Sequence, residues 1–346
     1  MTLLMGAGTS IVTNMRISRA SLVLVFLLTA LPATTSSAQI QAPPINGECI
    51  EIAKGYKCFY GPFKYSDVDQ DGDLIFSGFV RPPDASGYIT SMRAALEDAD
   101  GGFVPRHAVH LHHAVWLNTR KPDMTCDNFI APDLLPYLPD RFFATGKERT
   151  KIELPDGYGY HWDNKKIDGY PFLAPTWYMN THLHWMHGDE PEEVYIRLNL
   201  GFTHDDEADG VTDVRPVWFD VDNCSDSEFD VPGPKDPGNN YKRTWDWTMP
   251  EGGRFVTLGG HLHDGGRRLK LFNRTTKEMV YVSRAKYGSK NPADSGWDLR
   301  KMSAYSADPG IDVAAGDVLR LTAVYDHSRA WKGVMGIMIG ALVVEE

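Results

Sequence analysis

The chain has 346 residues, with 46 acidic and 35 basic side chains and a formal net charge of −11. Hydrophobic residues make up 42% and charged residues 23%, which excludes a mainly disordered chain and leaves enough apolar mass for a core. The acidic balance argues against a nucleic-acid partner, because phosphate binding needs a positive surface, and the length suggests about two domains.

Residues 1–38 have the features of a signal peptide. Arg16 and Arg19 precede a nearly apolar run, Leu22–Leu31, and small residues at 36–38 offer a cleavage site. The run is too short to span a bilayer as a mature helix. We therefore predict that residues 1–38 are removed and that the remaining chain is secreted or periplasmic, with no stable membrane span. An uncleaved membrane anchor is the alternative interpretation.

The four cysteines, Cys49, Cys58, Cys126 and Cys224, are an even set in a chain predicted to be exported. In an oxidising compartment such a set predicts two disulfides, and four cysteines allow three pairings. We favour Cys49 with Cys58, which would close a short loop, and Cys126 with Cys224. The sequence has no CxxC motif, so neither a thiol redox site nor a zinc ribbon is indicated.

Short runs of strand-like alternation follow one another along the exported chain, separated by turns such as Arg81-Pro82-Pro83-Asp84. No long segment keeps a helical period, so the pattern predicts an all-β fold of sandwiches or jelly rolls. The expected strands are Leu74–Val80, His107–Leu117, Trp177–Met186, Glu193–Phe202, Val214–Val221, Arg254–Leu258, Leu269–Phe272, Met279–Ser283, Val318–Tyr325 and Val334–Val344.

A stretch rich in Pro and Gly, residues 230–238, marks the best candidate for a linker. We expect an N-terminal β-sandwich domain over residues 39–225 and a C-terminal β-sandwich domain over residues 226–346.

Nine of the twelve histidines fall in three short segments, which is typical of metal ligands. The segments contain His107, His110, His112 and His113, then His182, His184 and His187, and then His261 and His263. Buried, hydrogen-bonded histidines in β-cores are the alternative interpretation.

Strand geometry limits which of these rings can share an ion. His110 and His112 would lie on one face and His113 on the other, so the adjacent pair His112 and His113 can bind one ion only at a bulge or strong twist. His182 and His184 would share a face, with Asn180 beside them as an orienting group.

His261 and His263 would also share a face, and Asp264 is placed to orient His263. Met335 lies on a late apolar strand, where methionine is normally core filler. A thioether beside two imidazoles is different, because soft sulfur favours copper over zinc or magnesium.

The ordered series His112-His113, His184, His261-x-His263 and Met335 resembles the copper type II, ascorbate-dependent monooxygenases, which include peptidylglycine α-hydroxylating monooxygenase and dopamine β-monooxygenase. The resemblance implies two tandem jelly-roll domains, each holding one copper ion. It implies a first, electron-transferring copper on His112, His113 and His184, and a second, catalytic copper on His261, His263 and Met335. His182 competes with His184 for the first site, and His110 could join or replace one of the pair.

A closer likeness is to the stress up-regulated nodulin-like family, which has no settled activity. The matching pieces are Val104-Pro105, Val109-x-Leu111-His112-His113, residues 260–266 and residues 333–336. The peptidylglycine enzyme's substrate-binding Arg is replaced here by Gly259, and polar substrate contacts by Ile337 and Ile339. Peptidylglycine is therefore not the expected substrate.

These observations predict an exported copper-dependent monooxygenase that acts on a small-molecule or peptide substrate with O₂ and a reductant such as ascorbate. A non-catalytic copper-binding or stress protein on the same scaffold is the main alternative. Further alternatives are a carbohydrate-binding sandwich and a zinc hydrolase that uses Asp264 or Asp189 as its base.

Overall fold

The computed structural model describes residues 46–126, 137–165, 176–186, 191–224, 227–234, 239–288 and 297–345. All of these belong to one unit, Ala42–Glu346. The predicted signal peptide, His187 and Asp189 lie outside the described residues.

The described residues form 22 β-strands and two short 3-10 helices, Tyr65–Asp67 and Asp205–Glu207, and contain no α-helix. Within them, no helix has the length and apolar character that crossing a membrane requires. The alternating burial along strands such as β9, where every second residue from Trp177 to Trp185 is buried, is the pattern of a strand with one face on a core. The all-β prediction is confirmed.

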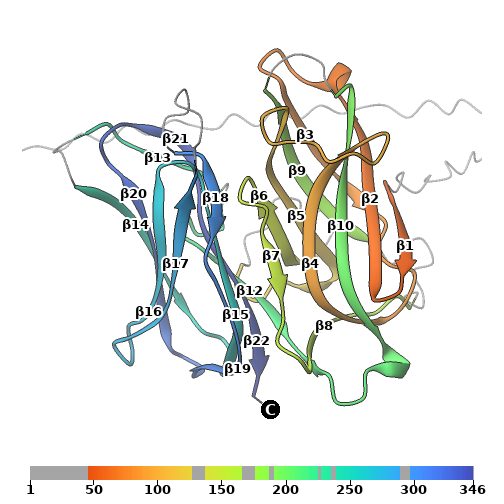
Figure 1. The fold of residues 1–346 in the computed structure, drawn as a ribbon. Coiled ribbons are helices and arrows are strands. Elements are labelled where there is room, and N and C mark those ends of the chain that lie inside the picture. The colour runs from red at the N-terminus through yellow and green to blue at the C-terminus, as the bar shows by residue number, and fades with distance from the viewer. Residues whose placement is uncertain are drawn as a thin grey trace, which may run out of the picture. The chain divides into compact units, whose positions relative to one another are not determined.

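The first group of strands, drawn in orange to green in Figure 1, forms two facing sheets. Trp116 of one sheet and Tyr60 and Leu198 of the other are fully buried in the core between them. The larger sheet has the order β1 (Glu48–Ile52), β2 (Gly55–Lys64), β10 (Glu193–His204), β4 (Gly87–Asp98), β8 (Tyr158–Trp162) and β11 (Thr212–Asp213), with β7 (Lys151–Glu153) on β4. The smaller sheet has the order β3 (Asp73–Val80), β9 (Trp177–Trp185), β5 (Val109–Pro122) and β6 (Pro139–Gly146).

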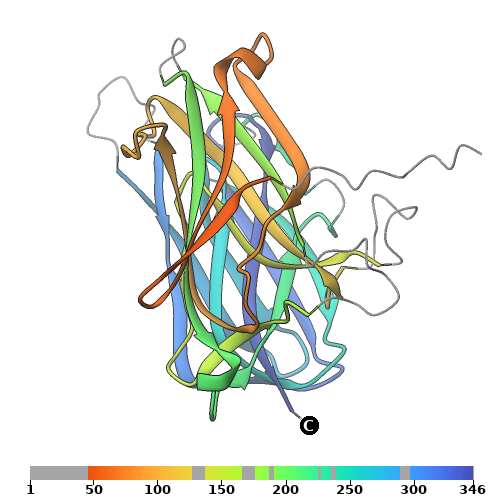
Figure 2. The same cartoon turned by 90° about the vertical axis from the view of Figure 1, so that its right-hand side faces the viewer.

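The second group, drawn in teal to blue, lies behind the first group in the view of Figure 2. It encloses its own core, in which Phe219, Phe255 and Leu321 are fully buried. One sheet has the order β12 (Arg215–Asp220), β22 (Gly336–Val344), β15 (Gly253–Leu262) and β19 (Ala304–Val313). Another has the order β14 (Asn240–Thr248), β20 (Val318–Asp326), β16 (Gly266–Asn273), β17 (Glu278–Tyr287) and β18 (Leu299–Met302), and β13 (Phe229–Val231) pairs with β21 (Trp331–Val334).

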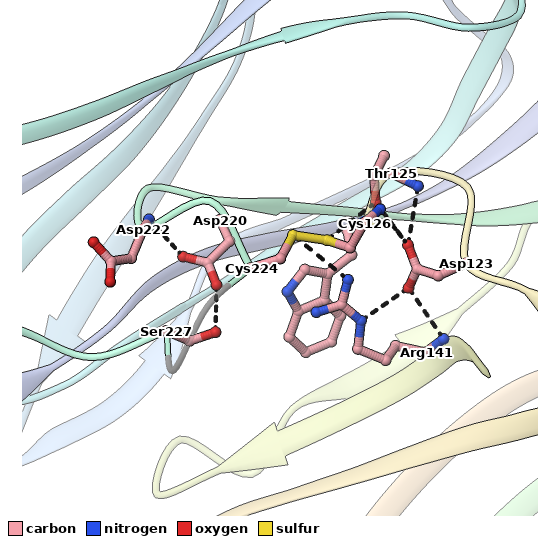
Figure 3. Close-up of a disulfide and its surroundings, with 9 residues drawn as sticks. Asp123, Thr125, Cys126, Arg141, Asp220, Asp222, Cys224 and Ser227 are labelled. Atoms are coloured by element: carbon pink, nitrogen blue, oxygen red, sulfur yellow. Dashed lines mark hydrogen bonds and ion pairs between the residues drawn. A yellow bond between two sulfur atoms is a disulfide. The ribbon is translucent and has the colours of Figure 1, made fainter. Parts of the chain in front are cut away.

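The cysteines form the two disulfides that the sequence favoured, so that prediction is confirmed. Cys49 and Cys58 face each other in the register of β1 and β2. Cys126, after β5, is joined to Cys224, which follows β12 (Figure 3). Two disulfides and no free cysteine are typical of a protein that works in an oxidising compartment.

Candidate metal centre

A bulge in β5 brings together the rings of the first histidine segment. Leu111 pairs with Leu183 of β9, but His113 pairs with His182, so His112 is an extra residue in the register. Such a bulge turns neighbouring side chains toward the same side of a strand. The Nδ1 atoms of His112 and His113 lie 3.4 Å apart as a result. This is the geometry that an adjacent pair needs in order to share an ion.

His182 completes a group of three imidazoles. One ligand nitrogen of each ring, His112, His113 and His182, lies within 4.8 Å of the other two. The ring of His182 has its centroid 4.5 Å from that of His112. His184 is on the same strand but lies outside this group, and its ring is 6.3 Å from that of His110. Between the two alternatives from the sequence, the structure places His182 beside the pair.

Polar partners fix the orientation of two of these rings. His113 Nε2 lies 3.0 Å from the Asn180 side-chain oxygen, and the Asn180 amide nitrogen donates to Ser77 Oγ at 2.6 Å. His182 Nε2 lies 2.7 Å from Asp73 Oδ1. A neutral imidazole that donates through Nε2 keeps a lone pair on Nδ1, which is the form that binds a metal ion. Asn180 thus contacts His113, whereas the sequence suggested that it lies beside His182 and His184.

Asp73 was not identified from the sequence, and it holds two histidines at once. Its Oδ1 accepts from His182 Nε2 and from His184 Nδ1, each at 2.7 Å. Partial burial raises the pKa of Asp73, but the hydrogen bonds from the two histidines outweigh it and hold the pKa below the usual value. Asp69 Oδ1 accepts the Asp73 backbone N–H at 2.9 Å and so fixes the start of β3.

The third histidine segment reaches the first. On β15 and just after it, the rings of His261 and His263 have centroids 5.1 Å apart. The ring of His263 lies 4.6 Å from that of His112. The two predicted copper sites thus adjoin in what we call the histidine cluster, which consists of His112, His113, His182, His261 and His263.

Two nitrogens of the cluster are buried without a partner. His261 Nδ1 lies 3.1 Å from Glu148 Oε1, a carboxylate that is 5% exposed and also accepts from Thr150 Oγ1 at 2.7 Å. The Nε2 atoms of His261 and His263 are buried and have no hydrogen-bond partner in the part of the chain that the structure describes. Leaving such an atom unpaired costs about 1–3 kcal/mol. A metal ion bound to these two nitrogens would remove this cost.

The protonation states of three of the five rings in the cluster also suit a metal. Burial, with the neighbouring imidazoles, lowers the pKa of His112 to about 3 and that of His113 to about 4. Burial lowers the pKa of His263 well below its ordinary value as well. These rings are therefore neutral at physiological pH, and a neutral imidazole is the metal-binding form.

Met335 lies between β21 and β22, across from His263. His261 pairs with Ile337 in the β15–β22 register and Leu262 with Gly336, so the next pair in line would be His263 and Met335. The Tyr325 hydroxyl accepts from the His263 backbone N–H at 3.0 Å and donates to the Met335 carbonyl at 2.5 Å. This bridge holds the two residues next to each other.

A largely apolar cleft of about 520 Å³ leads to the cluster. Met335 and His261 line it together with His113 and His182. Its walls include Val115, Leu117, Ile337 and Ile339. The two isoleucines that replace polar residues of the peptidylglycine enzyme therefore face this cleft.

Two further predicted residues lie beside the cluster and make other contacts. Asp264 Oδ2 pairs with Lys147 Nζ at 2.9 Å, and its Oδ1 accepts from the Leu299 backbone N–H at 3.3 Å. His110 lies near His184, and burial together with Lys147 lowers its pKa to about 4.

Two carboxylates touch the cluster. Asp73 is the last residue of an acidic run at positions 67–73, which is visible in the sequence. Glu148 lies in no recognisable motif, so no signal in the sequence points to it. Neutral imidazole nitrogens together with a thioether are the donor set that copper prefers, and Met335 lines the same cleft as His261.

The chain is similar to one protein family and to two proteins that are named for copper. Residues 178–346 match the model of the family described as Stress up-regulated Nod 19. The chain is 27% identical over 289 residues to "Probable copper-dependent oxygenase M1" of Phoma sp., covering 79% of this chain and 66% of that protein. It is 30% identical over 258 residues to "Probable copper-dependent oxygenase clz3" of Cochliobolus lunatus, covering 69% of this chain and 71% of the relative.

Among solved structures, the infectious bursal disease virus VP2 subviral particle matches with a TM-score of 0.21 at 11% identity, over 83% of this chain and 71% of that chain.

Proposed function

The chain belongs to the stress up-regulated Nod 19-like family, with copper oxygenase-like relatives, and on this premise we propose that it is a copper-dependent monooxygenase. In the proposed reaction one atom of O₂ enters a substrate C–H bond and the other leaves as water. A reductant such as ascorbate supplies the two electrons, and two protons complete the balance. The observation that carries the proposal is the pair of buried, unpartnered Nε2 atoms of His261 and His263 beside an apolar cleft.

Two groups of residues would hold two copper ions, which when bound supply the one-electron steps that activate O₂. We propose His112, His113 and His182 for the first, because their ligand nitrogens converge. The second group is His261, His263 and Met335, which the resemblance to the copper monooxygenases makes the catalytic set. His261 and Met335 line the apolar cleft, as do His113 and His182 of the first group.

The surrounding residues orient the ligands and exclude water. Glu148 accepts from His261 Nδ1 and so directs its Nε2 lone pair away from the carboxylate. Asn180 and Asp73 do the same for His113 and His182. The apolar walls of the cleft would hold a hydrocarbon part of the substrate in a dry environment, where a reactive oxygen species is protected from side reactions.

We also propose that the chain acts outside the cytoplasm, with residues 1–38 as its signal peptide. The two disulfides support this, because they persist in oxidising compartments. The division into two domains with one proposed copper site each, expected from the sequence over residues 39–225 and 226–346, is part of the same proposal. Strand β12 pairs with β22 and so lies with the second group of sheets.

Copper content and oxygen uptake test the function together. We expect His261→Ala and Met335→Ala each to lose one copper equivalent, and His182→Ala to lose the other. His184→Ala is the matched control, because it shares the strand and the Asp73 contact but lies outside the converging nitrogens. Ascorbate-dependent O₂ uptake should fall in the three ligand variants and persist in the control. Equal copper in all four proteins, or copper without reductant-dependent uptake, would contradict the proposal.

A further inference from the structure

A cavity of about 820 Å³ lies next to the histidine cluster and is lined mainly by charged side chains. Five of them are cations from four separate parts of the fold. They are Arg93 of β4, Arg106 before β5, Lys147 and Arg149 after β6, and Arg300 of β18. In a chain whose net charge is −11, such a gathering of cations needs an explanation.

Two of the five cations are neutralised by acids of the same cavity. Lys147 Nζ lies 2.9 Å from Asp264 Oδ2. Arg300 Nη2 lies 2.5 Å from Asp298 Oδ2. The remaining acid, Glu148, is engaged by the histidine cluster.

The other three cations, Arg93, Arg106 and Arg149, have no carboxylate partner among the described residues. Arg106 Nη1 donates to the Leu299 carbonyl at 3.3 Å. Arg149 Nη2 donates to the Val104 carbonyl at 3.1 Å, but its Nη1 is buried without a partner. Arg149 therefore holds a hydrogen-bond donor that the described protein does not satisfy.

Two of the guanidinium groups repel the third, that of Arg149. Burial, then Arg106 and Arg93, lower the pKa of Arg149 to about 10. Burial and then Arg300 lower the pKa of Arg106, while Asp298 and Glu148 offset part of this effect. Repulsion of the kind that acts on Arg149 is a cost that proteins keep at functional sites, where a ligand removes it.

The cavity adjoins a smaller pocket at the cluster. It shares His110, Lys147 and Asp264 with a smaller pocket of about 260 Å³. That smaller pocket is lined by His112, His261 and His263. A molecule anchored in the cavity can therefore extend to the cluster.

We propose that this cavity binds the carboxylate groups of a small molecule that carries two or more of them, and that this is the substrate class of the enzyme. The hydrocarbon part of such a molecule would extend past His261, which lines both the smaller pocket and the apolar cleft. Guanidinium forks match carboxylates in a bidentate manner, and three unpaired arginines call for more than one negative charge. The volume of about 820 Å³ leaves room for charges spaced along a carbon skeleton, whereas one compact phosphate would fill only a small part of it. The identification as substrate rests on the proposed oxygenase function, whereas the binding does not.

Titration calorimetry on the full-length, metal-free protein tests the binding, with tricarballylate as the probe. We expect one equivalent to bind, and its neutral triamide not to bind. Arg93→Gln and Arg149→Gln should each weaken binding by about tenfold or more, as expected for loss of a charge-assisted pair. Arg284→Gln is the matched control, because Arg284 is exposed on β17 and does not line the cavity; it should bind as the wild type does.

Thermal unfolding separates loss of a site from loss of structure. Arg93 makes no described ion pair, so Arg93→Gln should keep the ligand-free unfolding temperature while it loses affinity. Equal weakening by Arg284→Gln, binding of the triamide, or no binding at millimolar concentration would overturn the site. Phosphate binding as tight as that of tricarballylate would overturn the carboxylate class. Binding without oxygenase activity would remove the proposed function alone, and activity without binding would remove only this substrate class.

Discussion

At the scale of single residues, two carboxylates decide which imidazole nitrogens stay available. Glu148 accepts from His261 Nδ1 and leaves Nε2 unpaired, and Asp73 accepts from His182 Nε2. Each carboxylate thus fixes the tautomer of the imidazole ring that it contacts, and it makes the other nitrogen of that ring a stronger electron-pair donor to a metal ion. Burial raises the pKa of Glu148, but its contacts with His261 outweigh this and keep the pKa below the usual value, so the group stays ionised at neutral pH.

Replacing Glu148 by Gln should therefore weaken copper binding and leave the fold intact. The amide keeps a hydrogen-bond acceptor but loses the charge, and loss of such a partner typically costs about 10–100-fold in metal affinity. Competition with a chelator measures this affinity. Glu153→Gln is the control, because Glu153 is an exposed partner of Lys151. Equal affinities of the two variants would contradict the role of Glu148.

The sequence predicted the ligand-type residues because strand spacing places His261 and His263 on one face. It did not predict Glu148, which lies 113 residues from His261 along the chain. Local spacing carries no information on a contact of that range. In the sequence, Asp73 is only the last residue of the acidic run 67–73. In the structure, Asp69 accepts hydrogen bonds from the backbone of that run, so a turn accounts for the acidic residues without a metal ion.

At the scale of elements, a buried hydrogen-bonded network joins β5, β6 and β8. The Tyr160 hydroxyl accepts from Asn118 Nδ2 at 2.7 Å and donates to Asp140 Oδ2 at 3.0 Å. Burial, reinforced by Asp123, raises the pKa of Asp140 to about 8. The carboxyl group is therefore largely protonated at neutral pH in the folded protein, whereas it ionises near pH 4 in an unfolded chain.

This difference predicts a stability that declines with pH. Between about pH 4 and pH 8 the folded state binds one proton more than the unfolded state at Asp140, so the free energy of unfolding falls as pH rises. Asp140→Asn should remove this slope, because the amide has no proton to lose. Denaturant unfolding at several pH values measures it. A slope unchanged in the variant would show that Asp140 does not carry it.

The strands themselves were predictable because alternation reports burial of one face. From the sequence, a bulge at His112 could only be named as a requirement for His112 and His113 to share an ion. Period-two alternation does not reveal an extra residue in a strand, so the bulge itself was not predictable. The convergence of His112 with His263 depends on how a β5 residue and a residue following β15 pack, which no local pattern encodes.

At the scale of the whole molecule, the Cys126–Cys224 disulfide joins segments that follow β5 and β12 (Figure 3). Beside it, Arg141 pairs with Asp123 at 2.8 Å and lies over the Trp218 ring at 4.4 Å. The link therefore ties the first group of sheets to the second at a point where buried charges and an aromatic ring already meet. The pairing of β12 with β22 near the C-terminus was likewise not predictable from local pattern.

The two disulfides should differ in what they contribute. In the chain-entropy picture a link across 98 residues stabilises by about 4–5 kcal/mol, and one across 9 residues by about 2–3 kcal/mol. We expect Cys126→Ala/Cys224→Ala to lower the free energy of unfolding more than Cys49→Ala/Cys58→Ala. Equilibrium denaturation of both double variants makes the comparison, and the opposite order would contradict it.

The apolar walls around Met335 have a consequence for turnover. A hydroxyl group newly formed among Val115, Ile337 and Ile339 would leave its hydrogen-bonding capacity unmet, since these side chains have nothing to offer it. The oxidised molecule should therefore be held less tightly than the one that entered. If the proposed function is right, the hydrocarbon lining thus favours release of the hydroxylated product and leaves the cleft free for the next substrate molecule.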